Sequence, residues 1–203
     1  MSIEKVVQGI VDSVGLNIEN VSVSSQEEGM KRIVALMTQA GEDVSRRAEW
    51  SRSFKSVDIP ANATEFDLPS DFQKMIDSGA IVIKGAGFSP VRVIVDPATW
   101  GFLSTVGSDQ HYCHISGNKL LFNPNTGYTG ATLNYVSTNW LYEGDTLSSV
   151  ITSDTQTPIF PDHLLSLGTL WRYNRMVGLP FDDLAAEFEA NYTTALHSDR
   201  GTK

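Results

Sequence analysis

The chain has 203 residues, 41% hydrophobic and 19% charged, a composition typical of a folded protein rather than a disordered one. Its formal net charge of −9 argues against a broad phosphate-binding face, because nucleic-acid affinity comes mostly from cations that replace counterions. No apolar run reaches the roughly 20 residues that span a bilayer, and the single cysteine, Cys113, excludes an internal disulfide.

The first quarter of the chain has the apolar spacing of two amphipathic helices. Residues 3–14 carry Ile and Val every three or four positions, which predicts a helix that ends near Gly15. This segment has an acid inside its apolar face and no long apolar core, so it does not resemble a signal peptide. Ser24 and Ser25 each precede a glutamate by three residues, the pattern of a capping box. We therefore expect a long second helix from there to about residue 50.

The sequence changes character after residue 51, where aromatic and β-branched residues alternate with polar ones. Gly117-Asn118 predicts a two-residue hairpin turn between two strands, and Phe54, Val57 and Ile59 lie in an extended segment. Ser70 or Asp71 is expected to cap a short helix, and residues 96–104 are expected to form a helical turn. The pattern of this block predicts mainly antiparallel strands.

The C-terminal part of the chain predicts a helical hairpin over residues 159–203. Pro161-Asp162 starts the first helix, and Gly178 followed by a proline ends it. Asp182 or Asp183 then caps the second helix and places negative charge at its N-terminus. The apolar seam between the two helices is formed by Leu164, Leu167, Gly168, Trp171, Leu184, Phe188, Tyr192 and Leu196.

Together these elements predict an α+β fold with helices at both ends of the sequence. The N-terminal helices, residues 1–51, are expected to pack on the hairpin of residues 159–203 as one helical bundle. The antiparallel β block, residues 52–142, is inserted between them. Residues 143–158, rich in Ser, Thr and Asp, are expected to connect the β block to the hairpin as a polar loop without structure of its own.

The sequence offers no pattern for a catalytic, cofactor or metal site. Cys113 and His114, with His111 nearby, point to opposite faces of a strand, and no second Cys/His pair completes a tetrahedral shell. Gly85-Ala86-Gly87 lacks the third glycine and the following helix of a phosphate-binding loop. His163 has no G-x-S-x-G motif to serve. We therefore expect no enzyme, no cofactor and no metal.

Basic residues interleaved with aromatic residues occur at two places and leave two interpretations open. The first group contains Arg46, Arg47, Trp50, Arg52, Phe54 and Lys55. It either contacts an acidic partner or passing nucleic acid, or supplies cations to a helix C-terminus with both aromatic rings in the core, which we favour. The second group contains Trp171, Arg172, Tyr173 and Arg175. Its arginines suit either a helix end or a bridge to an acidic neighbouring subunit.

The order of these segments resembles that of the head–tail adaptor (connector) proteins of tailed bacteriophages, especially those of short-tailed phages. The resemblance rests on Leu68-Pro69-Ser70-Asp71-Phe72, on the hairpin from Gly117-Asn118 to Pro124, and on the closing helical hairpin from Leu164-Leu165 to Tyr192. It covers most of the chain.

This resemblance implies a structural protein of the virion, located in the tail or neck and made in the host cytoplasm. Such adaptors form a homo-oligomeric ring, a dodecamer in the virion, below the portal protein. The ring carries the tail nozzle or tail tube protein, with the helices as its body and the β block on the tail side. DNA passes through without being specifically bound, and no membrane is involved. An acidic lining would suit this passage, and the chain has no Lys or Arg from residue 120 through 171.

The expected subunit or portal interface consists of Arg46, Arg47, Arg52, Lys55, Arg172, Arg175, Asp182 and Glu189. Charge reversal at Arg172 and Arg175 is expected to impair ring assembly and leave the subunit folded. The alternative function is a non-catalytic ligand- or protein-binding module with a helical stalk. Exposure of Trp100, Tyr112, Tyr128 or Trp140 at a groove would favour that alternative.

Overall fold

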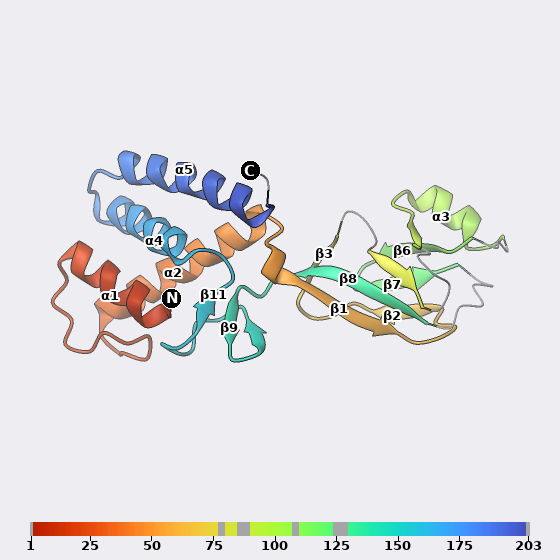
Figure 1. The fold of residues 1–203 in the computed structure, drawn as a ribbon, viewed down its shortest axis with the longest axis horizontal. Helices are drawn as coiled ribbons and strands as arrows, with labels where there is room; N and C mark the ends of the chain where they lie inside the picture. The colour runs from red at the N-terminus through yellow and green to blue at the C-terminus, as the bar shows by residue number, and fades with distance from the viewer. Residues whose placement is uncertain (1, 77–79, 85–89, 107–109, 124–129, 202–203) are drawn as a thin grey trace. The chain divides into compact units, whose positions relative to one another are not determined.

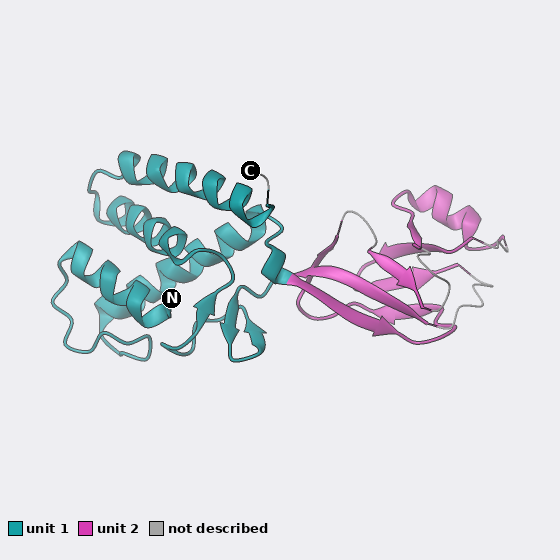
Figure 2. Cartoon of the chain, viewed as in Figure 1, with its two compact units in different colours: residues 1–53, 138–203 teal, residues 54–137 magenta. Residues whose placement is uncertain are grey.

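The computed structural model describes residues 2–76, 80–84, 90–106, 110–123 and 130–201 (Figure 1). The chain divides into two compact units, Met1–Ser53 with Thr138–Lys203 (unit 1) and Phe54–Ser137 (unit 2) (Figure 2). Unit 1 is mainly helical and unit 2 is mainly β, and each buries its own hydrophobic core. The predicted α+β fold class is confirmed.

Helix α1 (Ile3–Val14) ends where the sequence predicts, at Gly15, whose φ of 65° is the left-handed conformation that glycine adopts at little cost. Its first N–H groups are satisfied by a distant segment. The amides of Ile3 and Glu4 donate to the carbonyls of Gln156 and Asp154, at 2.8 and 3.0 Å. The start of α1 is therefore fixed by tertiary structure rather than by a local cap.

Helix α2 (Glu28–Arg47) begins later and ends earlier than predicted. Glu27 occupies the N-cap position with no side-chain cap, so the predicted capping box does not form. The preceding segment is instead held by Asp154, whose carboxylate accepts from the Ser22 hydroxyl at 2.6 Å and from the Val23 amide at 2.9 Å. After Arg47 the chain turns extended and enters the short 3₁₀ helix η1 (Ser51–Ser53).

The predicted C-terminal hairpin is present as α4 (Asp162–Val177) and α5 (Asp182–Asp199), joined at Gly178 with a φ of 77°. Phe181 rather than an aspartate is the N-cap of α5. Helix α4 packs against α1, α2 and α5 (Figure 1). The predicted seam is buried or half-buried throughout, because its residues face this helix cluster.

Residues 143–158 are not a loop without structure, and that prediction is wrong. Strand β9 (Leu141–Glu143) pairs with β10 (Thr146–Ser148) on one side and with β11 (Thr157–Pro158) on the other. The bend between β10 and β11 folds around the fully buried side chain of Gln156. Its Oε1 accepts from the amides of Thr152 and Ser153, at 2.8 and 3.2 Å, and its Nε2 donates to the Val150 carbonyl at 3.2 Å. A buried amide thus replaces the apolar residues that sequence patterns detect.

The Gln156→Leu variant should lose about 2 kcal/mol of unfolding free energy, because buried backbone groups around the side chain lose their hydrogen-bond partner. Limited proteolysis should cut the β10–β11 segment faster, and urea unfolding should give the loss in stability. Thr155→Ala is the matched control, since Thr155 is exposed one position away. Equal protease resistance of the two variants would contradict the role assigned to Gln156.

Unit 2 contains two four-stranded sheets. In the first, β8 (Ala131–Ser137) pairs with β1 (Phe54–Ile59), β3 (Phe72–Met75) and β4 (Ile81–Ile83), all antiparallel. In the second, β2 (Glu65–Asp67), β7 (Lys119–Phe122) and β6 (Tyr112–Ser116) are antiparallel, and β5 (Arg92–Val93) joins β6 in parallel. Apolar residues of both sheets form one core, as strand alternation predicts.

Several local predictions in unit 2 are tested by the structure. The hairpin turn at Gly117-Asn118 and the helical turn, now α3 (Pro97–Leu103) capped by Asp96, are confirmed. The short helix expected after Ser70 or Asp71 is wrong, since β3 lies there. The turn at Gly85-Ala86-Gly87 and residue Pro124 lie outside the described residues.

The two aromatic residues of the first basic group differ in burial. Trp50 is buried, and its indole N–H donates to the Val44 carbonyl at 3.0 Å. Phe54 is 47% exposed, so its predicted place in the core is wrong. It shares the outer face of β1 with Ser56 and Asp58, because side chains alternate along a strand.

Candidate interaction surfaces

Two of the predicted interface residues, Arg47 and Glu189, pair with each other within unit 1. The Arg47 guanidinium on α2 donates two hydrogen bonds, of 2.9 and 2.5 Å, to the Glu189 carboxylate on α5. It also lies 4.2 Å from the centre of the Tyr192 ring. The hydrogen bonds from Arg47 lower the pKa of Glu189 below its usual value. This bidentate pair ties α2 to α5.

Arg172 is likewise engaged inside the chain. Its guanidinium donates to Asp43 on α2 at 2.9 Å and to the Gly168 carbonyl at 2.8 Å, and it lies over the Trp171 ring at 4.2 Å. The side chain is only 13% exposed. Charge reversal at Arg172 would leave Asp43 facing a like charge. We therefore no longer expect that variant to leave the subunit folded.

The remaining predicted interface residues divide between paired and outward-facing side chains. Lys55 donates to Asp71 at 2.7 Å within unit 2, and Arg46 pairs with Glu42 one turn earlier on α2. The Arg52 guanidinium lies over the Tyr142 ring, and the Tyr142 hydroxyl donates a hydrogen bond to the Arg52 carbonyl. Asp182 is exposed in the first turn of α5. Arg175 makes no ion pair or hydrogen bond through its side chain to any part of the chain that the structure describes.

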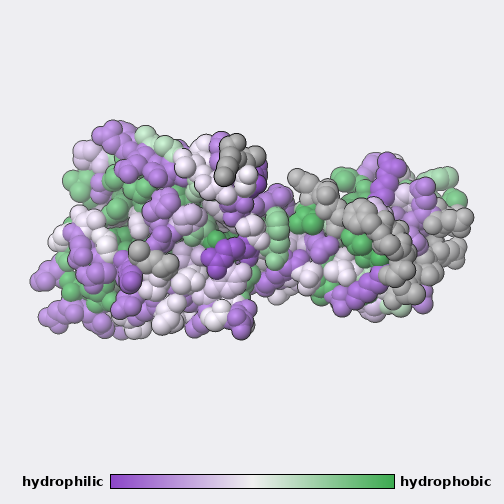
Figure 3. Space-filling view, viewed as in Figure 1, coloured by the Kyte–Doolittle hydropathy of each residue, from purple (hydrophilic) through white to green (hydrophobic). Residues whose placement is uncertain are grey.

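A groove of about 350 Å³ lies beside Arg175 on unit 1, and we call it the α2–α4 groove. It is lined by Leu36, Gln39, Trp171, Arg172, Arg175 and Met176. The adjoining turn between α4 and α5 exposes large apolar side chains: Met176, Val177 and Leu179 are 47%, 46% and 52% exposed. Figure 3 shows hydrophobic surface in this region of unit 1.

A second groove, of about 480 Å³, lies between the N-terminal half of α4 and the middle of α5, and we call it the α4–α5 groove. It is lined by Asp162, His163, Ser166, Leu167, Glu187 and Asn191. Its two acids and its apolar floor contrast with the cationic α2–α4 groove. The sequence interpretation missed Asp162 and Glu187 as surface residues of interest, because only the packing of α4 on α5 brings them together.

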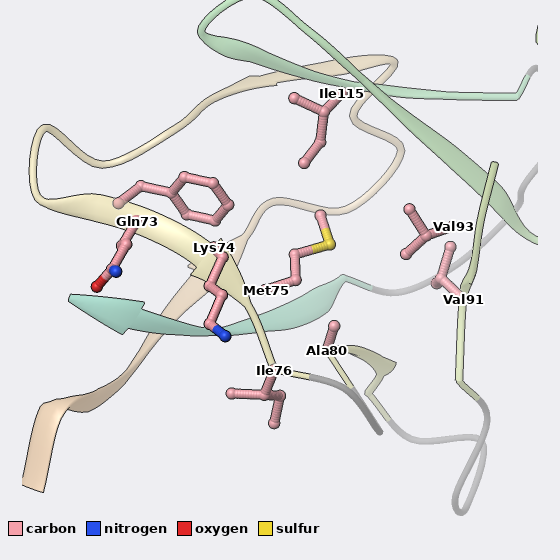
Figure 4. A pocket seen from close by; sticks show the side chains of 9 residues that line it. Gln73, Lys74, Met75, Ile76, Ala80, Val91, Val93 and Ile115 are labelled. Carbon is pink, nitrogen blue, oxygen red and sulfur yellow. The ribbon is translucent and has the colours of Figure 1, made fainter. Parts of the chain in front are cut away.

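Unit 2 has an apolar cavity of about 650 Å³ between β3 of one sheet and β5 and β6 of the other (Figure 4). Met75, Val93 and Ile115 point toward one another across it. The register of β3 shifts between Phe72 and Lys74, which marks a bulge at the rim. Gln73 and Lys74 are the polar side chains among the described residues that line the cavity, and the others are apolar, so it suits an apolar side chain.

The segment with His111, Cys113 and His114 has a structural explanation. The His114 ring stacks on Trp100 and its Nδ1 lies 2.8 Å from the Ile94 carbonyl. Cys113 is fully buried in the core of unit 2. Among the residues that the structure describes, no three His, Cys, Asp or Glu side chains are grouped so that they could hold a metal ion.

Cys113 should be unreactive in the native protein, because burial raises the pKa of its thiol to about 12 and only the thiolate attacks. At pH 8 a chromogenic disulfide reagent should label the folded chain far more slowly than the chain in guanidinium, where one thiol per chain should react. Rapid labelling of the native protein at the denatured rate would show that the core of unit 2 opens readily.

Three of the four aromatic residues whose exposure at a groove would favour a binding module lie in the described part of the chain. Trp140 is fully buried in the core of unit 1, and Trp100 and Tyr112 are half-buried in unit 2. Tyr128 lies outside the described residues. None of these three described aromatics lines the cavity or either groove.

Comparison with known proteins gives one family. The family model for the SU10 adaptor protein matches residues 7–203, which covers nearly all of both units. A comparison with curated proteins finds no match. Within the described residues, no helix has both the length and the apolar character that a bilayer crossing requires. Because the match spans far more than half of the sequence, the chain belongs to the SU10 adaptor protein family, a family of phage head–tail adaptors.

Proposed function

We propose that this phage adaptor forms a homo-oligomeric ring below the portal protein and bridges the portal to the tail nozzle or tail tube. The observation that carries the proposal is the adaptor family match, because it extends over residues 7–203 and so includes both units. In the ring, DNA passes through a central channel without specific binding. The net charge of −9 supports this passage, since acidic walls repel the phosphate backbone.

The exposed surfaces of unit 1 support the ring. A ring is built from heterologous contacts, in which two different patches of one subunit meet the opposite patches of its neighbours. The α2–α4 groove and the α4–α5 groove differ in charge and lie on different sides of α4, one beside α2 and the other beside α5. Arg46, Arg175 and Asp182 are exposed and make no ion pair or hydrogen bond between elements of the described chain, so we keep them as contact residues.

The experiment that tests the proposal mixes the purified chain with the portal protein of the same phage. Electron microscopy of the mixture should show an added ring of density on the portal, with rotational symmetry. The same mixture without the chain is the control. Portal particles that stay bare at micromolar concentrations of a folded chain would refute the adaptor role in this assembly.

A further inference from the structure

We propose that the α2–α4 groove binds the α4–α5 groove of a second copy of this chain, with Arg175 of one copy facing Asp162 and Glu187 of the next. The inference rests on the proposed ring and names the contact that builds it. The observation behind it is that the α2–α4 groove and the α4–α5 groove of one chain have opposite charges and that each includes apolar side chains.

The first surface has the features of an unfilled contact. The Arg175 side chain has no ion pair or hydrogen bond within the part of the chain that the structure describes. Beside it, Met176 and Leu179 are about half exposed, although most apolar residues of unit 1 are spent in its core. The indole N–H of Trp171 is buried at this groove and finds no acceptor among the described residues. An acidic partner with an apolar patch would complement the cation and cover the apolar side chains.

The second surface offers that complement. Asp162 and Glu187 lie at the α4–α5 groove, with Leu167 between α4 and α5 as an apolar floor. The Glu187 carboxylate accepts no hydrogen bond within the described residues, and the Asp162 carboxylate accepts one, from the His163 amide at 3.1 Å. Both acids are therefore free to meet a guanidinium, which binds carboxylates with up to two parallel hydrogen bonds.

A second copy is the occupant that the geometry favours over another protein. The two grooves belong to opposite sides of α4, so one molecule cannot pair its own Arg175 with its own Asp162 and Glu187. Each copy instead leaves one cationic and one acidic surface open. Contacts between them repeat from copy to copy and close into a ring if the rotation permits.

The test uses charge reversal on each side of the contact, in the full chain assembled on portal protein. Arg175→Glu and Glu187→Arg should each raise the chain concentration needed for ring formation by about tenfold or more, because each places like charges together. An equimolar mixture of these two single variants should assemble again. In an alternating ring every contact then joins opposite charges, whichever variant comes first. The double variant Arg175→Glu/Glu187→Arg should also recover.

The controls separate this contact from general effects of charge and folding. Lys5→Glu on α1 makes the same change in net charge as Arg175→Glu, on an exposed residue away from both grooves, and should assemble like the unaltered chain. Met176→Gln should weaken assembly without changing charge. Circular dichroism shows that each variant is folded before it is mixed with the portal.

The outcomes distinguish the contact from the ring itself. If the unaltered chain forms no ring on the portal, the proposed function fails. If the unaltered chain forms rings and Arg175→Glu forms them equally well, only the proposed contact is overturned. Failure of both single variants together with failure of their mixture also overturns the pairing of Arg175 with Glu187.

Discussion

The Gly41→Ala variant should lose about 3 kcal/mol or more of unfolding free energy, although it adds a single methyl group. A Cβ at this position on α2 would overlap three carbons of the Trp140 ring. That ring cannot retreat, since it is fully buried and stacked on Phe160 with centroids 5.9 Å apart. The Trp140 backbone is also fixed, by hydrogen bonds to the Ser148 carbonyl and from the Ile159 amide. Urea unfolding followed by circular dichroism measures the loss.

Two other glycines of unit 1 provide matched controls in the same measurement. Gly9 on α1 has open space around its Cβ position, so Gly9→Ala should gain up to about 1 kcal/mol from helix propensity. Gly168→Ala on α4 should change the unfolding free energy by an amount between these two, because the new Cβ would lie 3.1 Å from the Cβ of Ala40. Adding Trp140→Leu to Gly41→Ala should cost less than the sum of the two changes. A Gly41→Ala chain as stable as the Gly9→Ala chain would contradict the packing of Trp140 on α2.

The Asp71→Ala variant should destabilise unit 2 by about 3 kcal/mol, because it removes the acceptor for three donors in a half-buried site. The Asp71 carboxylate accepts from Lys55 at 2.7 Å, from Ser137 at 2.7 Å and from Tyr135 at 2.9 Å. It therefore joins the start of β1, the start of β3 and the end of β8. Hydrogen exchange of β8 amides reports the loss in unit 2 separately from unit 1.

The same carboxylate makes the stability of unit 2 depend on pH. Burial by itself would raise the pKa of Asp71, but the hydrogen bonds from Lys55, Ser137 and Tyr135 outweigh it and lower the pKa below 3.8. The folded state therefore holds the proton less tightly than the unfolded state. The ionised Asp71 carboxylate contributes its full stabilisation above the ordinary pKa, and this stabilisation is lost as the pH falls through the lower pKa of the folded state. Below about pH 4, the unfolding free energy of Asp71→Asn should therefore fall less steeply with decreasing pH than that of the unaltered chain.

Asp58 is the control for both Asp71 experiments. It also lies in unit 2 and pairs with a lysine, Lys84, at 2.7 Å, but its side chain is 70% exposed. Asp58→Ala should therefore change stability far less than Asp71→Ala. Equal losses in the two variants would show that the Asp71 cluster behaves as an ordinary surface ion pair.

Local signals explain which elements of the fold were predictable. Gly15 and Gly178 end their helices because glycine adopts the left-handed conformation without strain, and the spacing of apolar residues places α1, α4 and α5. Gly117 marks the β6–β7 hairpin in the same way. These signals act over a few residues, so a single sequence reveals them.

The errors in the prediction come from contacts between distant residues. The capping-box pattern at Ser24 and Ser25 failed because Asp154 holds the preceding turn. The expected helix after Asp71 is a strand, whose preceding turn is tied to β1 and β8 through that carboxylate. The buried Gln156 side chain orders residues 143–158 through its hydrogen bonds to the backbone. The pattern of apolar residues could not reveal this, since the sequence does not distinguish a buried glutamine from an exposed one.

The candidate interface likewise has features that local sequence signals predict and features that only contacts between distant residues determine. The α+β class, the helical hairpin, the acidic balance and the segment order that resembles phage adaptors can all be inferred from the amino-acid sequence, because they depend on composition, periodicity and turn residues. Which charged side chains remain available to a partner depends on the tertiary structure. Arg47, Arg172 and Glu189 are paired within unit 1, whereas Arg175 is left outward beside exposed apolar side chains. Whether a charge is spent inside the subunit or left for a partner depends on packing across more than a hundred residues, which no local pattern records.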